Sequence, residues 1–227
     1  MKEHPILMDA TSVRGLLDRT KTMTRRLVKA PRSKVLRYDL TRAWKDSLSG
    51  DEYLHAPFWH KDDGPPTDPD DETWQRICAP FTTGDLLYVK EAWQDFCPLW
   101  DGLWCGHGDK EGIARDHLVA YRADGKGIDH KDHKNRLPEK WRPSIYMPRW
   151  ASRLTLRVTS VRVQRLNDIT GRDALAEGVD NGSSNPTMGK RWENMQQMAF
   201  QARWESIHGA GSWGPHWVWC YGLEVVT

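Results

Sequence analysis

The segment Lys21-Thr22-Met23-Thr24-Arg25-Arg26 combines an amine, two hydroxyls and two guanidinium groups. A lysine that has lost its water shell can give up its proton and act as a base toward a threonine hydroxyl. Lys21 and Thr24 are therefore candidate catalytic residues. Thr22, Arg25 and Arg26 are candidate substrate contacts, because guanidinium groups bind phosphates and carbonyls. The same residues also fit an ordinary surface strand, so spacing alone leaves both interpretations open.

Glu177 stands at the expected end of a short helix, in the sequence Ala174-Leu175-Ala176-Glu177-Gly178. A carboxylate there faces the negative end of the helix dipole, which is mildly unfavourable unless a cation compensates it. Residues set against their local preference gather at functional sites, and Lys21 would be a suitable partner. The alternative is a solvated glutamate, which costs about a few tenths of a kcal/mol.

Tryptophan is unusually frequent, with 13 residues. Three of these tryptophans are candidate binding residues together with nearby charged side chains, and the group is Trp93, Trp141 and Trp150 with Lys90, Glu91, Arg142 and Arg149. Aromatic rings interleaved with arginines suit stacking on bases together with phosphate contact. They equally suit core packing with arginine side chains lying along it, so both uses stay open.

A group of potential zinc ligands lies between residues 97 and 133. Its members are Cys97, Cys105, His107, His117, His130 and His133. The spacing Cys-x7-Cys-x-His followed by His-x2-His matches no closed zinc module. The favoured interpretation is therefore a group without a metal, zinc binding is the alternative, and the sequence predicts no cofactor.

Composition and charge limit the class of protein. The chain has 227 residues and a net charge of +2, so bulk electrostatics do not demand a nucleic-acid partner. Positive charge is concentrated between residues 14 and 42, and residues 62–72 are acidic. No apolar run approaches the roughly 20 residues of a membrane helix, and the N-terminus lacks the apolar core of a signal peptide. These features predict a cytoplasmic protein that does not contact a membrane.

The expected order of elements is strand, helix, several strands, helix, helix, strand. The sequence predicts strands at residues 6–8, 86–91, 152–166 and 217–226, and helices that begin near Thr11 or Ser12, at Thr170, and around Trp192. Within residues 152–166 the alternation of apolar residues slips at Thr159-Ser160, which indicates a bulge or sharp bend. The prolines of residues 141–148 predict extended chain there. The order of elements predicts an α+β fold with a closed or half-closed sheet.

The apolar residues of the two longer helices predict which faces are buried. The first helix presents Val13, Leu16 and Leu17, and the last presents Trp192, Met195, Ala199, Ala202, Trp204 and Ile207. Residues 29–80 and 94–136 are weakly patterned, apart from a possible strand at residues 118–121. They are interpreted as insertions in a single domain that covers residues 1–227.

Four motifs taken together resemble the ASCH-domain proteins that phages and prophages encode. They are L-D-x-x-K-T-x-T-R-R, G-D-x-L-Y-V-K-E-x-W, W-R-P-S-I-x-M-P-R-W-A-S-R and D-A-x-A-E-G. The resemblance covers roughly residues 5–28, 84–93 and 141–227. It implies a PUA-like fold, which is a small β-barrel with helices at its rim, here with long loop insertions. It also implies a pocket that recognises RNA or a modified base, and a place in the host cytoplasm if a phage encodes the chain.

The same superfamily includes the bacterial N(4)-acetylcytidine amidohydrolases, which carry a K-T-x-T-x-R segment and a later glutamate. In that family the lysine, the second threonine and the glutamate are catalytic, and they fall here on Lys21, Thr24 and Glu177. Arg26 matches the arginine that follows. Relatives in the phage group usually have glycine where this chain has Arg19, so the turn before Lys21 departs from their pattern.

Three functions follow as hypotheses. The first is an amidohydrolase on an acylated nucleobase or nucleoside, with Lys21 as the base, Thr24 as the nucleophile or water activator, and Glu177 orienting Lys21. The second is a non-catalytic module that binds a modified base, RNA or single-stranded nucleic acid. It would stack bases on tryptophan and hold phosphates with Arg25, Arg26, Lys90 and Arg149. The third is an ASCH-type ribonuclease.

Overall fold

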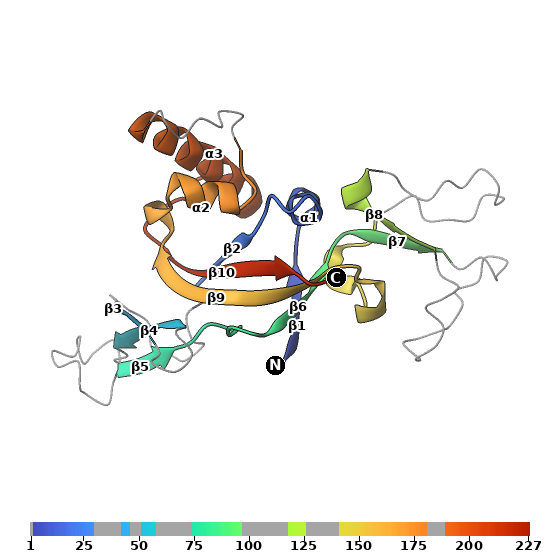
Figure 1. Cartoon of the computed structure of the whole chain (residues 1–227), viewed down its shortest axis with the longest axis horizontal. Coiled ribbons are helices and arrows are strands. Elements are labelled where there is room, and N and C mark those ends of the chain that lie inside the picture. The colour runs from blue at the N-terminus through green and yellow to red at the C-terminus, as the bar shows by residue number, and fades with distance from the viewer. Residues whose placement is uncertain are drawn as a thin grey trace. The chain divides into compact units, whose positions relative to one another are not determined.

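The computed structural model describes residues 2–29, 42–45, 51–57, 74–96, 118–125, 141–180 and 189–227. It has an α+β fold, as predicted from the order of elements (Figure 1). The helices are α1 (Ala10–Leu17), α2 (Gly171–Ala176) and α3 (Lys190–His208). The strands are β1 (Glu3–Leu7), β2 (Met23–Leu27), β3 (Arg42–Lys45), β4 (Glu52–Pro57), β5 (Trp74–Ile77), β6 (Leu86–Lys90), β7 (Trp93–Phe96), β8 (Leu118–Tyr121), β9 (Thr155–Arg165) and β10 (Trp217–Val225).

The main sheet has five strands in the order β1-β6-β9-β10-β2. Its outermost described strands are β1 and β2, so the sheet is open and no closed barrel is shown. Strand β1 pairs parallel to β6, whereas β2 pairs antiparallel to β10. Two smaller antiparallel sheets, β3-β4-β5 and β7-β8, fall largely within the stretches predicted to be insertions. The strand expected at residues 118–121 is confirmed as β8.

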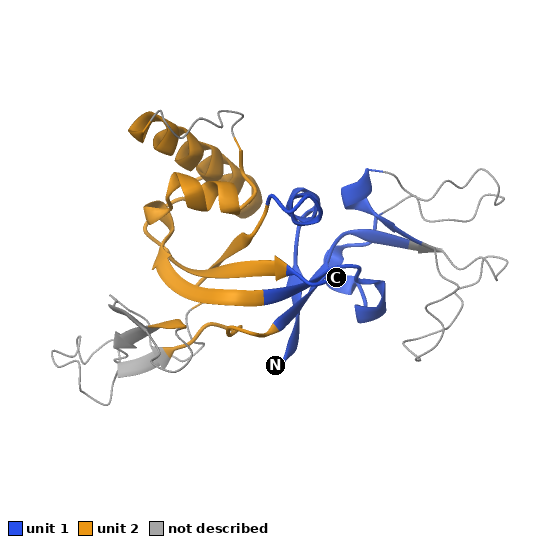
Figure 2. Cartoon of the chain, in the orientation of Figure 1, with its two compact units in different colours: residues 1–20, 86–157, 225–227 blue, residues 21–85, 158–224 orange. Residues whose placement is uncertain are grey.

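The chain divides into two compact units (Figure 2). Unit 1 contains residues 1–20, 86–157 and 225–227, and unit 2 contains residues 21–85 and 158–224. Lys21 and Glu177, the candidate amine and carboxylate, both belong to unit 2. The tryptophan-rich candidates from Lys90 to Trp150 belong to unit 1.

In unit 1, helix α1 begins at a different cap from the one expected. Asp9, in extended conformation, accepts a hydrogen bond from the Thr11 backbone N–H, so neither Thr11 nor Ser12 is the cap. Val13 and Leu16 are buried as predicted, but Leu17 is 42% exposed. The prolines of residues 141–148 exclude an α-helix but leave room for a single 3-10 turn at Ser144–Tyr146, so this stretch is not extended throughout.

In unit 2, strand β9 carries the predicted slip. Thr159 and Ser160 are both exposed, although they are neighbours in one strand. The buried apolar positions on either side are Leu154 and Leu156 in unit 1 and Val158, Val161 and Val163 in unit 2. Two consecutive outward side chains are typical of a bulge, and Gly222 of β10 leaves the space that they need, since an added methyl group there would meet both hydroxyls.

Helices α2 and α3 pack against each other in unit 2. Thr170 caps α2 by accepting a hydrogen bond from the Asp173 backbone N–H, as predicted. The buried face of α3 consists of Trp192, Gln196, Phe200 and Trp204. The expected face was partly wrong, because Ala202 and Ile207 are exposed and a fully buried glutamine replaces an apolar residue. None of the described helices is both long and apolar enough to cross a membrane.

Arg19 occupies the position after helix α1 where the chain turns toward β2. Its φ is 58°, a left-handed conformation, and its backbone N–H donates to the Leu16 carbonyl at 3.1 Å. Such a turn is a common helix ending and favours glycine. Arg19 therefore adopts a turn conformation that glycine would adopt more easily.

Replacing Arg19 by glycine should raise the free energy of unfolding by about 0.5–1 kcal/mol. Relief of the left-handed backbone, which costs an L-residue roughly 1–2 kcal/mol, exceeds the added entropy of the unfolded chain. Urea unfolding measures the change. Asp18→Gly is the matched control. Because Asp18 has an ordinary right-handed φ of −78°, this glycine relieves no strain, and the variant should be less stable than the wild type. Equal or lower stability of Arg19→Gly would contradict this explanation.

Candidate functional site

A buried ion pair joins two of the predicted catalytic residues, Lys21 and Glu177. Lys21 Nζ lies 2.7 Å from Glu177 Oε2 and also donates to the Glu177 carbonyl oxygen at 2.8 Å. The side chains are only 4% and 6% exposed. Their backbones form an isolated antiparallel bridge, and the neighbouring Thr22 N–H donates to the Ala176 carbonyl at 2.7 Å. The predicted meeting of Lys21 with Glu177 is therefore present in the structure.

Arg25 extends the ion pair into a network. Its guanidinium donates to Glu177 Oε1 at 3.0 Å and to Asp173 Oδ2 at 2.9 Å, and its side chain is completely buried. Arg162 of β9 lies 2.8 Å from the same Asp173 oxygen and is 37% exposed. The network thus holds three cations and two carboxylates, all contributed by unit 2. Because Arg25 is buried and committed to two carboxylates, it is a structural member of the site rather than a surface contact.

Local backbone geometry explains how Glu177 reaches Lys21. Helix α2 ends at Ala176, and Gly178 then turns the chain with a φ of 77°. A methyl group at Gly178 would lie 3.1 Å from Lys21 Cβ, so glycine permits both the turn and the close approach. The Ala-Glu-Gly sequence therefore ends the helix and seats the lysine stem against the backbone.

Thr24 is buried but stands apart from this network. Side chains alternate along a strand, which places Thr24 on the opposite face of β2 from Arg25. Its cross-strand neighbour is Tyr221, whereas Arg25 pairs with Cys220 in the core beneath α2 and α3. Among the described residues, no hydrogen bond joins the Thr24 hydroxyl to Lys21 or Glu177. The structure brings together two of the three expected catalytic residues and places the third on another face.

The remaining candidates, one just before β2 and one on it, differ in exposure. Thr22 is exposed and Arg26 is half-buried.

Burial raises the pKa of the Cys220 thiol to about 12, and this effect outweighs the nearby charges of Arg25 and Arg162, which lower the pKa. Cys220 is therefore a neutral core residue, and it adds no charge to the network.

The tryptophan-rich candidates lie in unit 1 and mostly serve packing. Trp93 is 2% exposed, with the Arg142 guanidinium 5.2 Å from its ring centre, so it is a core residue. Trp150 is 37% exposed and meets Trp93 edge-on. Trp141 is half-buried.

The charged candidates of unit 1 are bound to their neighbours. Lys90 donates to the Ile145 carbonyl at 2.6 Å, and Arg149 forms an exposed ion pair with Glu3. Each of these two cations therefore already has an acceptor within unit 1.

Glu91 belongs to a second buried cluster that sequence reasoning missed. It is 1% exposed, and both of its oxygens accept hydrogen bonds from Arg153. The same guanidinium donates twice to Asp124 and lies 4.0 Å from the Tyr121 ring centre. Burial raises the pKa of the Glu91 carboxyl more than the Arg153 hydrogen bonds lower it. Arg153 is the last residue of the W-A-S-R motif, and this motif was the only feature of the sequence that pointed to the contact of Arg153 with Glu91 and Asp124.

Asp173 and Arg162 were also missed as members of the site. Asp173 lies in the first turn of α2, and Arg162 is one of several arginines in β9. The cluster of cysteines and histidines between residues 97 and 133 lies outside the described residues. Within the described ranges no group of three or more potential metal ligands occurs.

Comparisons with known proteins do not identify a family for this chain. No protein-family model, curated protein or solved structure matches it. The assignment of chemistry to the site therefore depends on its own geometry and on the motifs in its sequence.

Replacing Glu177 by glutamine should destabilise the protein strongly. Removing one partner of a buried ion pair leaves uncompensated charge, which typically costs about 3–5 kcal/mol. Chemical unfolding measures the loss. Glu3→Gln is the matched control, since the Glu3–Arg149 pair is 42% and 45% exposed and should contribute at most about 1 kcal/mol. Similar losses for the two variants would contradict the assigned role of Glu177.

The stability supplied by Asp173 should depend on pH. Burial by itself raises the pKa of this carboxyl, but the Arg162 hydrogen bond and the charges of Arg25 and Arg162 outweigh it, so the pKa lies below its ordinary value. The contribution is then complete above the unfolded-chain pKa of about 3.9 and disappears as pH falls through the folded pKa. Urea unfolding of wild type and Asp173→Asn across pH 2–7 should show their stabilities converging in acid. A difference that stays constant over this range would exclude the effect.

Proposed function

We propose that the chain is an ASCH-type amidohydrolase with a PUA-like fold, and that it removes an acyl group from the N(4) position of a cytidine-like base. The buried contact between Lys21 and Glu177 carries this proposal. The two residues are far apart in the sequence, yet they meet in the pairing that the N(4)-acetylcytidine amidohydrolases would require. The motif resemblance and the side-chain geometry both support the same pair.

The environment of Lys21 suits proton transfer. An ammonium group has three N–H donors, and the Glu177 carboxylate and carbonyl take two of them. One Nζ position is left to address a substrate or a water molecule. Because Glu177 fixes the direction of Nζ through two acceptors, it is the positioning residue in this account, and Lys21 is the residue that touches the reacting atoms.

Hydrolysis of the acyl amide needs a nucleophile for the acyl carbon and a proton for the departing nitrogen. In the direct route, the oxygen of water bonds to the acyl carbon and the carbon–N(4) bond breaks. The Lys21 ammonium gives one proton to the departing N(4), and the neutral amine that remains takes one from the attacking water. The products are the free amine of the base and a carboxylic acid, so the addition of one water balances the reaction.

Thr24 has two distinguishable roles within the same proposal. As a nucleophile it would form an ester on its hydroxyl, which water would then hydrolyse. As a substrate contact it would form no covalent bond. Its position on the opposite face of β2 from Arg25, with no hydrogen bond to Lys21, favours water as the nucleophile. Mass spectrometry of rapidly quenched reactions distinguishes the roles, since only the first adds an acyl mass to Thr24.

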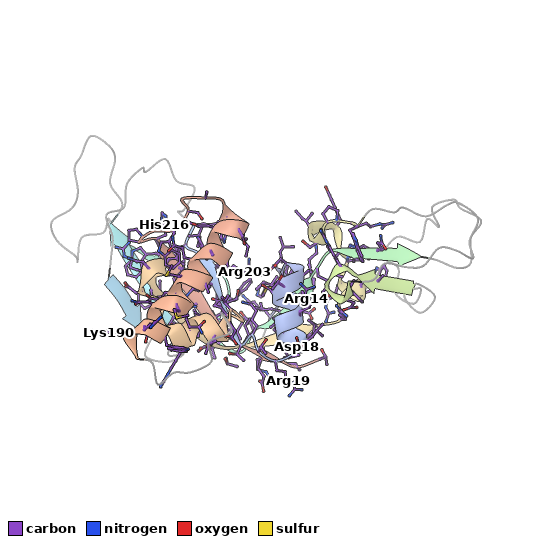
Figure 3. The ribbon with its side chains drawn as sticks, turned by 90° about the horizontal axis from the view of Figure 1, so that it is seen from above. Arg14, Asp18, Arg19, Lys190, Arg203 and His216 are labelled. Atoms are coloured by element: carbon purple, nitrogen blue, oxygen red, sulfur yellow. The ribbon has the colours of Figure 1, made fainter. Side chains whose placement is uncertain are left out.

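The activity is tested with N(4)-acetylcytidine and the full chain. We expect release of acetate, and we expect Lys21→Met to lower kcat/KM by about 10²–10⁴-fold, the usual range for a general acid–base residue. Methionine keeps much of the lysine stem, and unfolding curves would establish that the variant is folded. Lys190→Met is the matched control because Lys190 is an exposed lysine at the start of α3 (Figure 3).

Intact substrate after long incubation at high enzyme concentration would overturn the proposal. So would a folded Lys21→Met variant that retains full activity. Tight binding of N(4)-acetylcytidine without acetate release would point to a base-binding module.

A further inference from the structure

Two adjacent hydroxyls lie together on the bulge of β9. A methyl group added at Gly222 would lie 2.6 Å from Thr159 Oγ1 and 2.5 Å from Ser160 Oγ, so both hydroxyls lean over the same glycine. Thr159 and Ser160 are exposed. Neither hydroxyl forms a hydrogen bond with any residue in the described part of the chain. A pair of solvent-accessible donors therefore converges above a backbone that has no side chain.

This hydroxyl pair shares a face of the sheet with the ion network. Gly222 is the cross-strand partner of Met23. The Met23 sulfur accepts contacts from Arg25 Nη1 at 3.4 Å and from Arg162 Nη2 at 3.6 Å. Ser160 precedes Arg162 by two residues in β9, and side chains two apart in a strand point to the same face. The hydroxyls, Arg162 and the network thus lie on one side of unit 2.

Arg162 is the network cation that can also meet a ligand. It is 37% exposed, and only its Nη2 is committed within the described residues, to Asp173 and Met23. Its Nε and Nη1 remain as donors. The bonded network has three cations and two carboxylates. A further carboxylate, Glu52, also raises the pKa of Arg162, but by less than Asp173 does. Within the described residues, Arg162 therefore offers two N–H groups to a ligand on this face.

We infer that Thr159, Ser160 and Arg162 form a phosphate subsite, so that the substrate is a cytidine nucleotide rather than a free nucleoside. A phosphate oxygen accepts hydrogen bonds from serine and threonine hydroxyls, and a guanidinium adds charge-assisted donors. The identity of the nucleotide as the substrate rests on the proposed function, whereas phosphate binding itself does not. Gly222 contributes by letting both hydroxyls lie close to the sheet.

Calorimetric titration of the full chain with cytidine 5′-monophosphate, cytidine and inorganic phosphate tests the subsite without any reaction. The monophosphate should bind at least about tenfold more tightly than cytidine, which corresponds to about 1.4 kcal/mol. Inorganic phosphate should compete with the monophosphate but not with cytidine. Competition with both, or with neither, would contradict the inference.

Ser160→Ala should weaken binding of the monophosphate about tenfold and leave binding of cytidine unchanged. Ser206→Ala is the matched control, because Ser206 is an exposed serine of α3 whose hydroxyl donates only to the Arg203 carbonyl. Gly222→Ala should weaken binding of the monophosphate to a similar extent, since the methyl group would displace both hydroxyls. Equal affinities of Ser160→Ala and Ser206→Ala for the monophosphate would overturn the inference, even if Gly222→Ala failed to fold.

The inference and the proposed function fail separately. Acetate release together with equal affinity for cytidine and its monophosphate would contradict the phosphate subsite and support the hydrolase. If the monophosphate binds more tightly than cytidine, Ser160→Ala removes this preference, and no acetate is released, the phosphate subsite is supported and the hydrolase is contradicted.

Discussion

The contact between Lys21 and Glu177 constrains the rest of unit 2. Both side chains are buried, and the loss of hydration costs several kcal/mol per charge unless close opposite charges offset it. Arg25 and Asp173 supply further opposite charges, and Arg162 closes the network at the surface. Strand β2, helix α2 and strand β9 must therefore keep their mutual register, since each carries one part of the network. Well-packed apolar residues would often give equal or better stability at such a place, which is why we regard the network as serving chemistry.

Much of the secondary structure could be predicted from the sequence, because it depends on local rules. The Thr170 cap, the end of α2 before Gly178 and the slip in β9 all follow from neighbouring residues, and all are present. The buried face of α3 was less predictable. Gln196 is fully buried, and only the surrounding helices and sheet determine that a polar residue sits there while Ile207 stays exposed. The closure of the sheet is likewise a long-range property, and the described strands form an open sheet.

The site was predictable to the extent that its residues conflict with local preference. Glu177 faces the wrong end of a helix dipole, which signalled a cationic partner, and Lys21 is that partner. Asp173 gave no such signal, because an acidic residue near a helix start satisfies the local rules whatever else it does. Arg153 and Arg162 resemble many other arginines until the fold brings carboxylates to them. The face on which Thr24 lies could have been predicted, because an odd spacing in an extended segment places two side chains on opposite faces, and Thr24 is three residues from Lys21.

A double-mutant cycle on kcat/KM for N(4)-acetylcytidine, with Lys21→Met and Glu177→Gln, tests the central claim most directly. If the two side chains work as one proton-transfer unit, the double variant should be about as slow as Lys21→Met alone, because Glu177 has no role once Nζ is gone. Independent losses that multiply in the double variant would contradict the account, as would a wild-type chain that leaves the acetyl group in place.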